Sequence, residues 1–215
     1  MKNTLFLLCF LLSIHMQAQE YYAAKLLFVN GEIMEGKATL PTNKVLINNI
    51  KIKKKGSKIT TLISSNTIYQ VLYTLYNGNK YLFERNKIGI TPKLFKKQRI
   101  GSSFEKEWFL VTYSHPLIKA YISTQSYYVN KQEGVLETHS YEGRNIIFGT
   151  SYFLKRPNEE VPTLMSLSNT QNSKFREWAS VYFKENKALV TRIKNKEFKG
   201  SQIYQLAIAY ALSIN

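Results

Sequence analysis

The chain has 215 residues and a formal net charge of +16, from 30 lysines and arginines against 14 acidic residues. Every acidic residue is a glutamate, which excludes aspartate-based calcium loops, aspartic dyads and Ser-His-Asp triads. The single cysteine, Cys9, lies near the start, so the rest of the chain has no cysteine nucleophile and no thiolate metal site. We therefore expect neither a metal nor a cofactor.

The first residues have the anatomy of a secretory signal peptide. Lys2 gives a positive start, and an apolar run from Leu5 to Ile14 follows that is too short to span a membrane. Ala18 then provides a small residue before a cleavage position. We predict a signal peptide over residues 1–18 and a mature chain in the periplasm, at the cell surface or secreted. The mature chain is expected to contain no transmembrane span.

Residues 21–85 predict a succession of three β-hairpins. Asn30-Gly31 and Asn77-Gly78 each separate two apolar-rich runs, and this dipeptide is the strongest short-range hairpin signal. Strand-like runs continue to about residue 155. We predict an antiparallel β-meander sheet, curled or barrel-like, over residues 19–165.

The pattern changes to a helical period in the last part of the chain. Phe175, Trp178, Ala179 and Tyr182 share one face of a predicted helix. A second helix is predicted over residues 187–198. A third should place one apolar stripe on the core: Ile203, Leu206, Ala207, Tyr210 and Ala211. The predicted fold class is therefore α+β, with a helical cap over residues 166–215 packed on the sheet.

Between the two Asn-Gly hairpins lies the stretch IKIKKKGSK, residues 50–58, with five lysines. A turn at Gly56-Ser57 would pair strands 50–55 and 58–63, with Ile50, Ile52 and Ile59 on the buried face. Like charges facing one another across strands destabilise a hairpin, unless something acidic offsets them. We predict that this basic face binds an anionic partner through Lys51, Lys53, Lys55 and Lys58, with Lys96, Lys97 and Arg99 as a second group.

The partners that fit are an acidic polysaccharide, lipopolysaccharide or an envelope protein. Nucleic acid is not expected as a physiological partner, because the chain is predicted to be exported. We favour a non-enzymatic role. One alternative is a hydrolase that uses His115 or His139 with a glutamate, although no G-x-S-x-G nucleophile elbow is present. Another alternative is a structural component of an envelope assembly.

The exported start, the segment VNGEIMEGKA and the aromatic strands in mid-chain resemble a family of uncharacterised exported proteins common in Bacteroidota. That family has an N-terminal signature of the form N-G-D-T-x-x-G-K. Asn30, Gly31, Gly36 and Lys37 match the signature, whereas Glu32 and Ile33 stand where it has Asp and Thr. The resemblance implies an envelope or secreted location and carries over no functional residue.

Overall fold

The structure is a computed structural model and describes residues 20–44, 48–88, 106–139, 142–143, 146–147, 149–168 and 171–214. The predicted signal peptide, residues 1–18, lies outside the described residues, as do Lys96, Lys97 and Arg99. In the part that is described, strands come first and helices last, and the predicted α+β class is confirmed.

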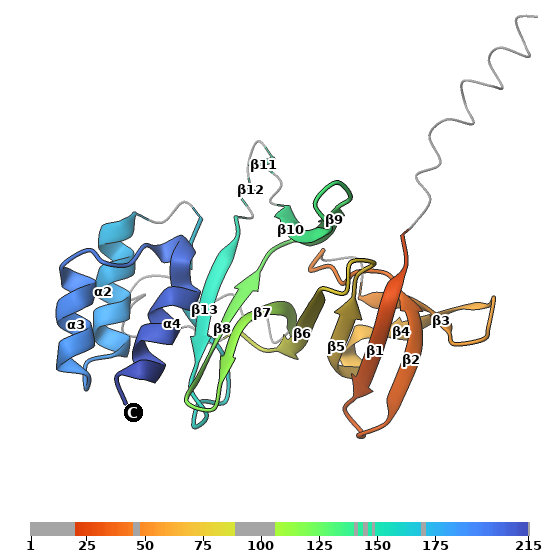
Figure 1. The fold of residues 1–215 in the computed structure, drawn as a ribbon, viewed down its shortest axis with the longest axis horizontal. Helices are drawn as coiled ribbons and strands as arrows, with labels where there is room; N and C mark the ends of the chain where they lie inside the picture. Colours follow the sequence, from red (N-terminus) through yellow and green to blue (C-terminus); the bar gives the residue numbers. More distant parts are fainter. Residues whose placement is uncertain are drawn as a thin grey trace, which may run out of the picture.

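One antiparallel sheet dominates the described part of the chain. Its strands are β1 (Tyr22–Phe28), β2 (Ile33–Ala38), β3 (Asn49–Lys54), β4 (Thr60–Ser64), β5 (Ile68–Thr74), β6 (Lys80–Asn86), β7 (Glu107–His115), β8 (Ile118–Ser123), β13 (Ser151–Lys155) and β14 (Thr163–Leu167). Their order is β14-β13-β8-β7-β6-β5-β1-β2-β3-β4, so β14 and β4 form the two ends of an open sheet. Figure 1 shows β1 to β4 at one end of the molecule and the helices at the other.

The sheet departs from a simple meander at β5, and again at β13, which pairs with β8 although further short strands outside this sheet come between them in the chain. The short 3-10 helix η2 (Ser65–Thr67) leads from β4 into β5, and β5 then pairs with β1 rather than with β4. The first strand of the described chain therefore lies inside the sheet, between β2 and β5. The three hairpins form as predicted, since β1 pairs with β2, β3 with β4 and β5 with β6. In the two Asn-Gly turns, Gly31 and Gly78 have positive φ values of 87° and 84°, as such turns require.

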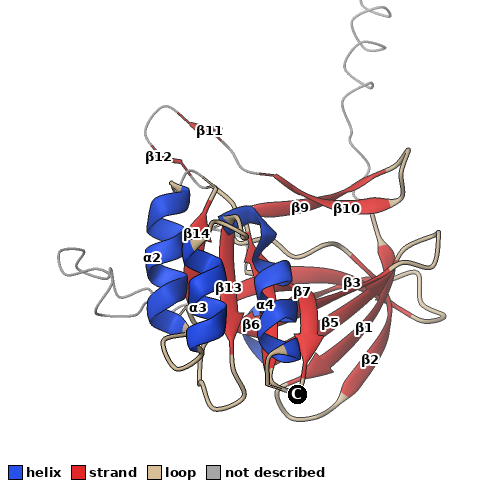
Figure 2. Cartoon of the chain, turned by 60° about the vertical axis from the view of Figure 1, so that its left-hand side comes forward, coloured by secondary structure: helices blue, strands red, loops and turns tan. Residues whose placement is uncertain are grey.

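The first core lies on one face of β1, β2, β3, β5, β6 and β7. The hairpin of β9 (Ser126–Asn130) and β10 (Val135–His139) runs across one end of the sheet strands, as Figure 2 shows, and adds Tyr127 to this core. A short pair, β11 (Glu142–Gly143) and β12 (Ile146–Ile147), follows. The fully buried residues of this core include Leu26, Ala38, Ile50, Ile52, Val71, Tyr73, Phe83 and Trp108.

The second core lies between the sheet and the helices. The helical elements are α2 (Asn172–Tyr182), α3 (Lys187–Lys194), η3 (Gly200–Gln202) and α4 (Ile203–Leu212). They cover β8, β13 and β14 (Figure 2), and every residue of the stripe predicted for the last helix is buried there. No helix in the described ranges combines the length and the apolar character that crossing a bilayer requires.

Arg156, directly after β13, connects the sheet to the helices. Its Nη2 donates a hydrogen bond to the carbonyl of Tyr182 at 2.8 Å and forms an ion pair with Glu185. The guanidinium also lies over the rings of Tyr182, Phe183 and Tyr210, at 4.5, 5.2 and 5.1 Å from their centroids. With only 18% of its side chain exposed, Arg156 is held by α2, by the segment after it and by α4 together.

Candidate functional site

The lysine-rich stretch forms the hairpin that the sequence predicts. Strand β3 pairs with β4 with Ile50 opposite Ile63, which is the register that a turn centred on Gly56-Ser57 produces. Gly56 has a positive φ of 80°, in the left-handed region that favours glycine. The register therefore directs alternate lysines of β3 away from the core.

One part of the hairpin prediction is wrong. Ile59 is 75% exposed, although strand alternation predicts it on the buried face. The reason is that β4 begins only at Thr60, so Ile59 precedes the paired part of the strand. Leu62 on β4 is also 60% exposed, and the apolar contribution of this hairpin comes chiefly from Ile50 and Ile52 on β3.

The structure brings together only part of the predicted binding face. Lys53 and Lys55 line a groove on the outer face of the sheet, and the described residues that line it do not include Lys51 or Lys58. Lys51 is half-buried and lies opposite Leu62, and Lys58 is exposed ahead of β4. The second predicted group, Lys96, Lys97 and Arg99, falls outside the described residues.

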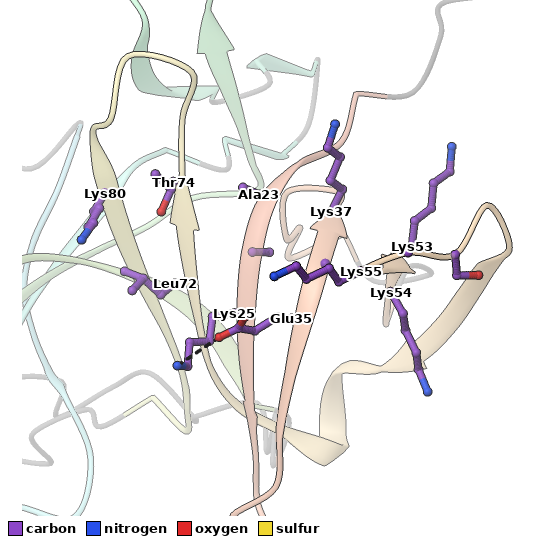
Figure 3. Close-up of a pocket in the computed structure, with 14 residues that line it drawn as sticks. Ala23, Lys25, Glu35, Lys37, Lys53, Lys54, Lys55, Leu72, Thr74 and Lys80 are labelled. Atoms are coloured by element: carbon purple, nitrogen blue, oxygen red, sulfur yellow. Dashed lines mark ion pairs between the residues drawn. The ribbon is translucent and has the colours of Figure 1, made fainter.

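The groove has a volume of about 650 Å³ and lies on the outer face of β1, β2, β3, β5 and β6 (Figure 3). Ala23, Ala24 and Lys25 of β1 line it. Because side chains alternate along a strand, those of Ala24 and Leu26 belong to the core on the other face. Glu35 is the one acidic residue among its described lining residues. The lysines that line the groove come from several separate strands and turns: Lys25, Lys37, Lys53, Lys54, Lys55 and Lys80.

Two of these lysines are direct neighbours across strands. Lys37 on β2 lies opposite Lys53 on β3. Like charges directly opposite one another repel and destabilise the pairing of the two strands. The Lys53 Nζ lies 4.5 Å from the centre of the Tyr21 ring, a cation–π contact that offsets part of the repulsion. Glu35 is already paired with Lys25 at 3.2 Å, and no other carboxylate of the described residues forms an ion pair with Lys37 or Lys53.

Gly36 determines how closely the two strands approach. A Cβ atom at Gly36 would lie 2.2 Å from the backbone oxygen of Lys53, far inside van der Waals contact. Only a glycine therefore lets β3 pack against β2 at this point. This close approach is what sets Lys37 beside Lys53.

Sequence reasoning missed four of the lysines that line the groove: Lys25, Lys37, Lys54 and Lys80. Strand alternation was a signal for Lys25, because it interrupts an otherwise apolar strand between Ala24 and Leu26. Lys80 had no comparable signal, because it joins the groove only through the pairing of β1 with β5.

The hydrolase hypothesis places a histidine beside a glutamate, and His115 and Glu84 do line a second hollow of about 440 Å³. The His115 Nδ1 accepts a hydrogen bond from the backbone NH of Leu117 at 3.3 Å. Within the described ranges, no hydroxyl is hydrogen-bonded to His115. His139, the other candidate, ends β10. The hypothesis stays a prediction: esterase or glycosidase activity that a His115→Ala or His139→Ala variant loses would establish it.

Glu84 is a buried carboxylate with several donors around it. It is 2% exposed and accepts hydrogen bonds from the Lys119 Nζ at 2.7 Å and the Tyr121 hydroxyl at 2.8 Å. Burial alone would raise the pKa of Glu84, but the bonds from Lys119 and Tyr121 and the Lys119 charge outweigh it and hold this pKa below its ordinary value. Glu84 is thus occupied by structural contacts.

The lowered pKa of Glu84 predicts how the stability of the protein depends on pH. A carboxyl with a lowered pKa stabilises the fold above its unfolded pKa of about 4.3, and this contribution is lost as pH falls through the folded pKa. Glu84→Gln should lower the free energy of unfolding by about 2 kcal/mol at pH 7, a value that allows for the partial exposure of Lys119. Urea unfolding from pH 7 to pH 3 measures both effects, since the variant should lose stability less steeply in acid.

Glu107→Gln is the matched control for that prediction. Burial raises the pKa of Glu107, while the Ser123 hydroxyl and the Arg85 charge offset only part of the effect. The charged form of Glu107 is therefore disfavoured in the fold, and neutralising it should not reduce stability at pH 7. Equal losses in the two variants would contradict the role given to Glu84.

Within the described residues, no group of three or more His, Cys, Asp or Glu side chains is placed to hold a metal ion. Comparison of the chain with protein-family models, curated proteins and solved structures finds no match. The candidate ligand sites are the basic groove and the hollow beside Glu84. Of the two, the groove has the larger excess of positive charge: six lysines and one glutamate line it, whereas Lys119, Lys155, Arg156 and one glutamate line the hollow.

Proposed function

We propose that the protein is an exported, non-enzymatic protein that binds an anionic component of the cell envelope in the basic groove. The observation that carries the proposal is the cross-strand pair of Lys37 and Lys53, which has no carboxylate partner among the described residues. An anion bound between the two side chains would remove their repulsion and gain charge-assisted hydrogen bonds. The signal-like start and the resemblance to exported Bacteroidota proteins support the envelope location.

The proposal predicts that neutralising the pair weakens binding to a polyanion. A Lys37→Gln/Lys53→Gln variant should elute from immobilised heparin at lower salt than the unaltered protein. At about 0.5–1 kcal/mol for each lysine, the affinity at low salt should fall roughly tenfold. The measurement is the elution salt concentration, together with the affinity of soluble heparin at several ionic strengths.

A matched control separates the groove from net charge. Lys174 and Lys184 are exposed on and just after α2 and do not line the groove, so Lys174→Gln/Lys184→Gln removes the same charge elsewhere. The control should elute close to the unaltered protein. If both double variants elute at the same salt concentration, the groove is not the binding site.

The same basic face could instead hold an acidic surface of a partner protein in an envelope assembly. Recovery of the chain with one stoichiometric partner from native membranes, lost in the Lys37→Gln/Lys53→Gln variant, would favour that role. Recovery of a monomer that still binds heparin would favour the polyanion.

A further inference from the structure

The strand register arranges residues of the groove in one line across the sheet. Lys53 lies opposite Lys37, Lys37 opposite Ala23, Ala23 opposite Thr74, and Thr74 opposite Lys80. Residues that lie opposite one another in antiparallel strands share a face, so the five stand side by side on β3, β2, β1, β5 and β6. All five line the groove, and Figure 3 shows them in this sequence from Lys53 to Lys80. We call them the transverse row.

The transverse row has cations at both ends and small residues in its middle. Lys53 and Lys37 form one end and Lys80 the other, while Ala23 and Thr74 form the floor between them. No ion pair joins Lys37 or Lys80 to a carboxylate of the described residues. The row is thus a shallow track across the strands, with positive charge at each end.

The length of the row decides which kind of anion it fits. Neighbouring strands lie about 4.8 Å apart, so the four spacings from β3 to β6 place Lys53 and Lys80 roughly 19 Å apart at their backbones. A compact anion such as phosphate reaches one end only. An amphiphile with a single charged head is also disfavoured, because its apolar tail would end over a lysine. An extended chain with repeated negative charges satisfies both ends at once.

We propose that the groove binds a linear polyanion, an acidic polysaccharide chain, laid across the strands along the transverse row. This inference rests on the proposed function and adds the form of the ligand and its direction. The chain contacts Lys53 and Lys37 at one end, passes over Ala23 and Thr74, and contacts Lys80 at the other end. Affinity then depends on the length of the chain and on an open floor as well as on charge.

Heparin oligosaccharides of increasing length test the proposal, with inorganic sulfate as the compact anion, in calorimetric titrations of the full chain. Affinity should rise at least tenfold from disaccharide to octasaccharide and then level off. Lys80→Gln should weaken octasaccharide binding about threefold to fivefold and leave disaccharide binding unchanged. If sulfate binds as tightly as the octasaccharide, or if Lys80→Gln has no effect on the octasaccharide, the linear ligand is overturned while anion binding in the groove stands.

A second variant tests the open floor without changing charge. Ala23→Tyr fills the middle of the row and should reduce octasaccharide binding about tenfold. Ile33→Tyr is the control, because Ile33 is 59% exposed on β2 and does not line the groove. Thermal unfolding of both variants verifies that they fold. Unchanged octasaccharide binding in Ala23→Tyr would contradict binding of the chain along the transverse row. An unaltered protein that binds neither heparin nor sulfate would overturn the proposed function itself.

Discussion

Replacing Arg156 with alanine is expected to lower the free energy of unfolding by about 3 kcal/mol, because several interactions of one largely buried cation disappear together. The guanidinium donates to the Tyr182 carbonyl, pairs with Glu185 and contacts the rings of Phe183 and Tyr210. Its loss leaves the carbonyl and the carboxylate without this partner and opens a void between the sheet and the helices. Arg156→Lys should recover only part of the loss, since an ammonium lacks the planar fork and stacks less well.

Urea denaturation measures this change, followed by circular dichroism for the helices and by tryptophan fluorescence. Arg192→Ala is the matched control. Arg192 also combines an ion pair, with Glu197 at 2.8 Å, and a ring contact, with Phe198 at 5.2 Å. It is 48% exposed, however, and its partners follow α3 directly, so its removal should change stability by about 0.5 kcal/mol. Similar losses in the two variants would contradict the view that Arg156 holds the helices to the sheet.

Gly36→Ala is the second change for which we expect a large effect. The added Cβ would lie 2.2 Å from the Lys53 oxygen, a backbone atom that cannot turn aside as a side chain can. Strand β3 must therefore move away from β2. We expect a loss of about 3 kcal/mol in stability, from overpacking and weakened strand pairing. Because Lys37 and Lys53 then separate, heparin affinity should fall as well.

Gly78→Ala separates the steric effect at Gly36 from the general effect of replacing a glycine. Gly78 has a φ of 84°, and a Cβ atom added there would have no other atom within 4 Å. Its substitution therefore causes backbone strain but no steric clash. A loss of about 1 kcal/mol and an unchanged heparin affinity are expected there. Thermal unfolding and heparin elution of the two variants provide the comparison. A Gly36→Ala variant with full heparin affinity would show that the approach of β3 to β2 does not shape the groove.

Local patterns were sufficient to predict the hairpins and the helical faces. Asn-Gly turns determine which strands join in a hairpin, and the apolar stripe of α4 determines which side faces the core. These local patterns could not predict the order of the hairpins within the sheet. The pairing of Ala23 with Thr74 joins two hairpins far apart in the sequence, and no turn chemistry specifies that contact. The groove depends on it, since the pairing brings Lys80 into line with Lys37.

The candidate site was predicted in part for the same reason. Alternation in β3 correctly placed Lys53 on the outer face, because the period of a strand is local. It could not show that Lys51 would lie outside the groove, because the bounds of the groove depend on β2 and β5. Gly36 and Lys37 were noticed only through a family signature. The structure gives these two residues a physical role, since one allows close strand packing and the other contributes charge.

The interior position of β1 has a consequence for the order in which the chain folds. The ribosome delivers the N-terminus first, so the hairpin of β1 and β2 exists before β5 is available. During that interval β1 has an open hydrogen-bonding edge, and such an edge can pair with another nascent copy. On the outer face of that hairpin, Lys25 is paired with Glu35 at 3.2 Å, whereas Lys37 has no carboxylate partner among the described residues. The charge of Lys37 would then disfavour contact between unfinished chains until β5 pairs with β1, a protective role that precedes any binding by the finished groove.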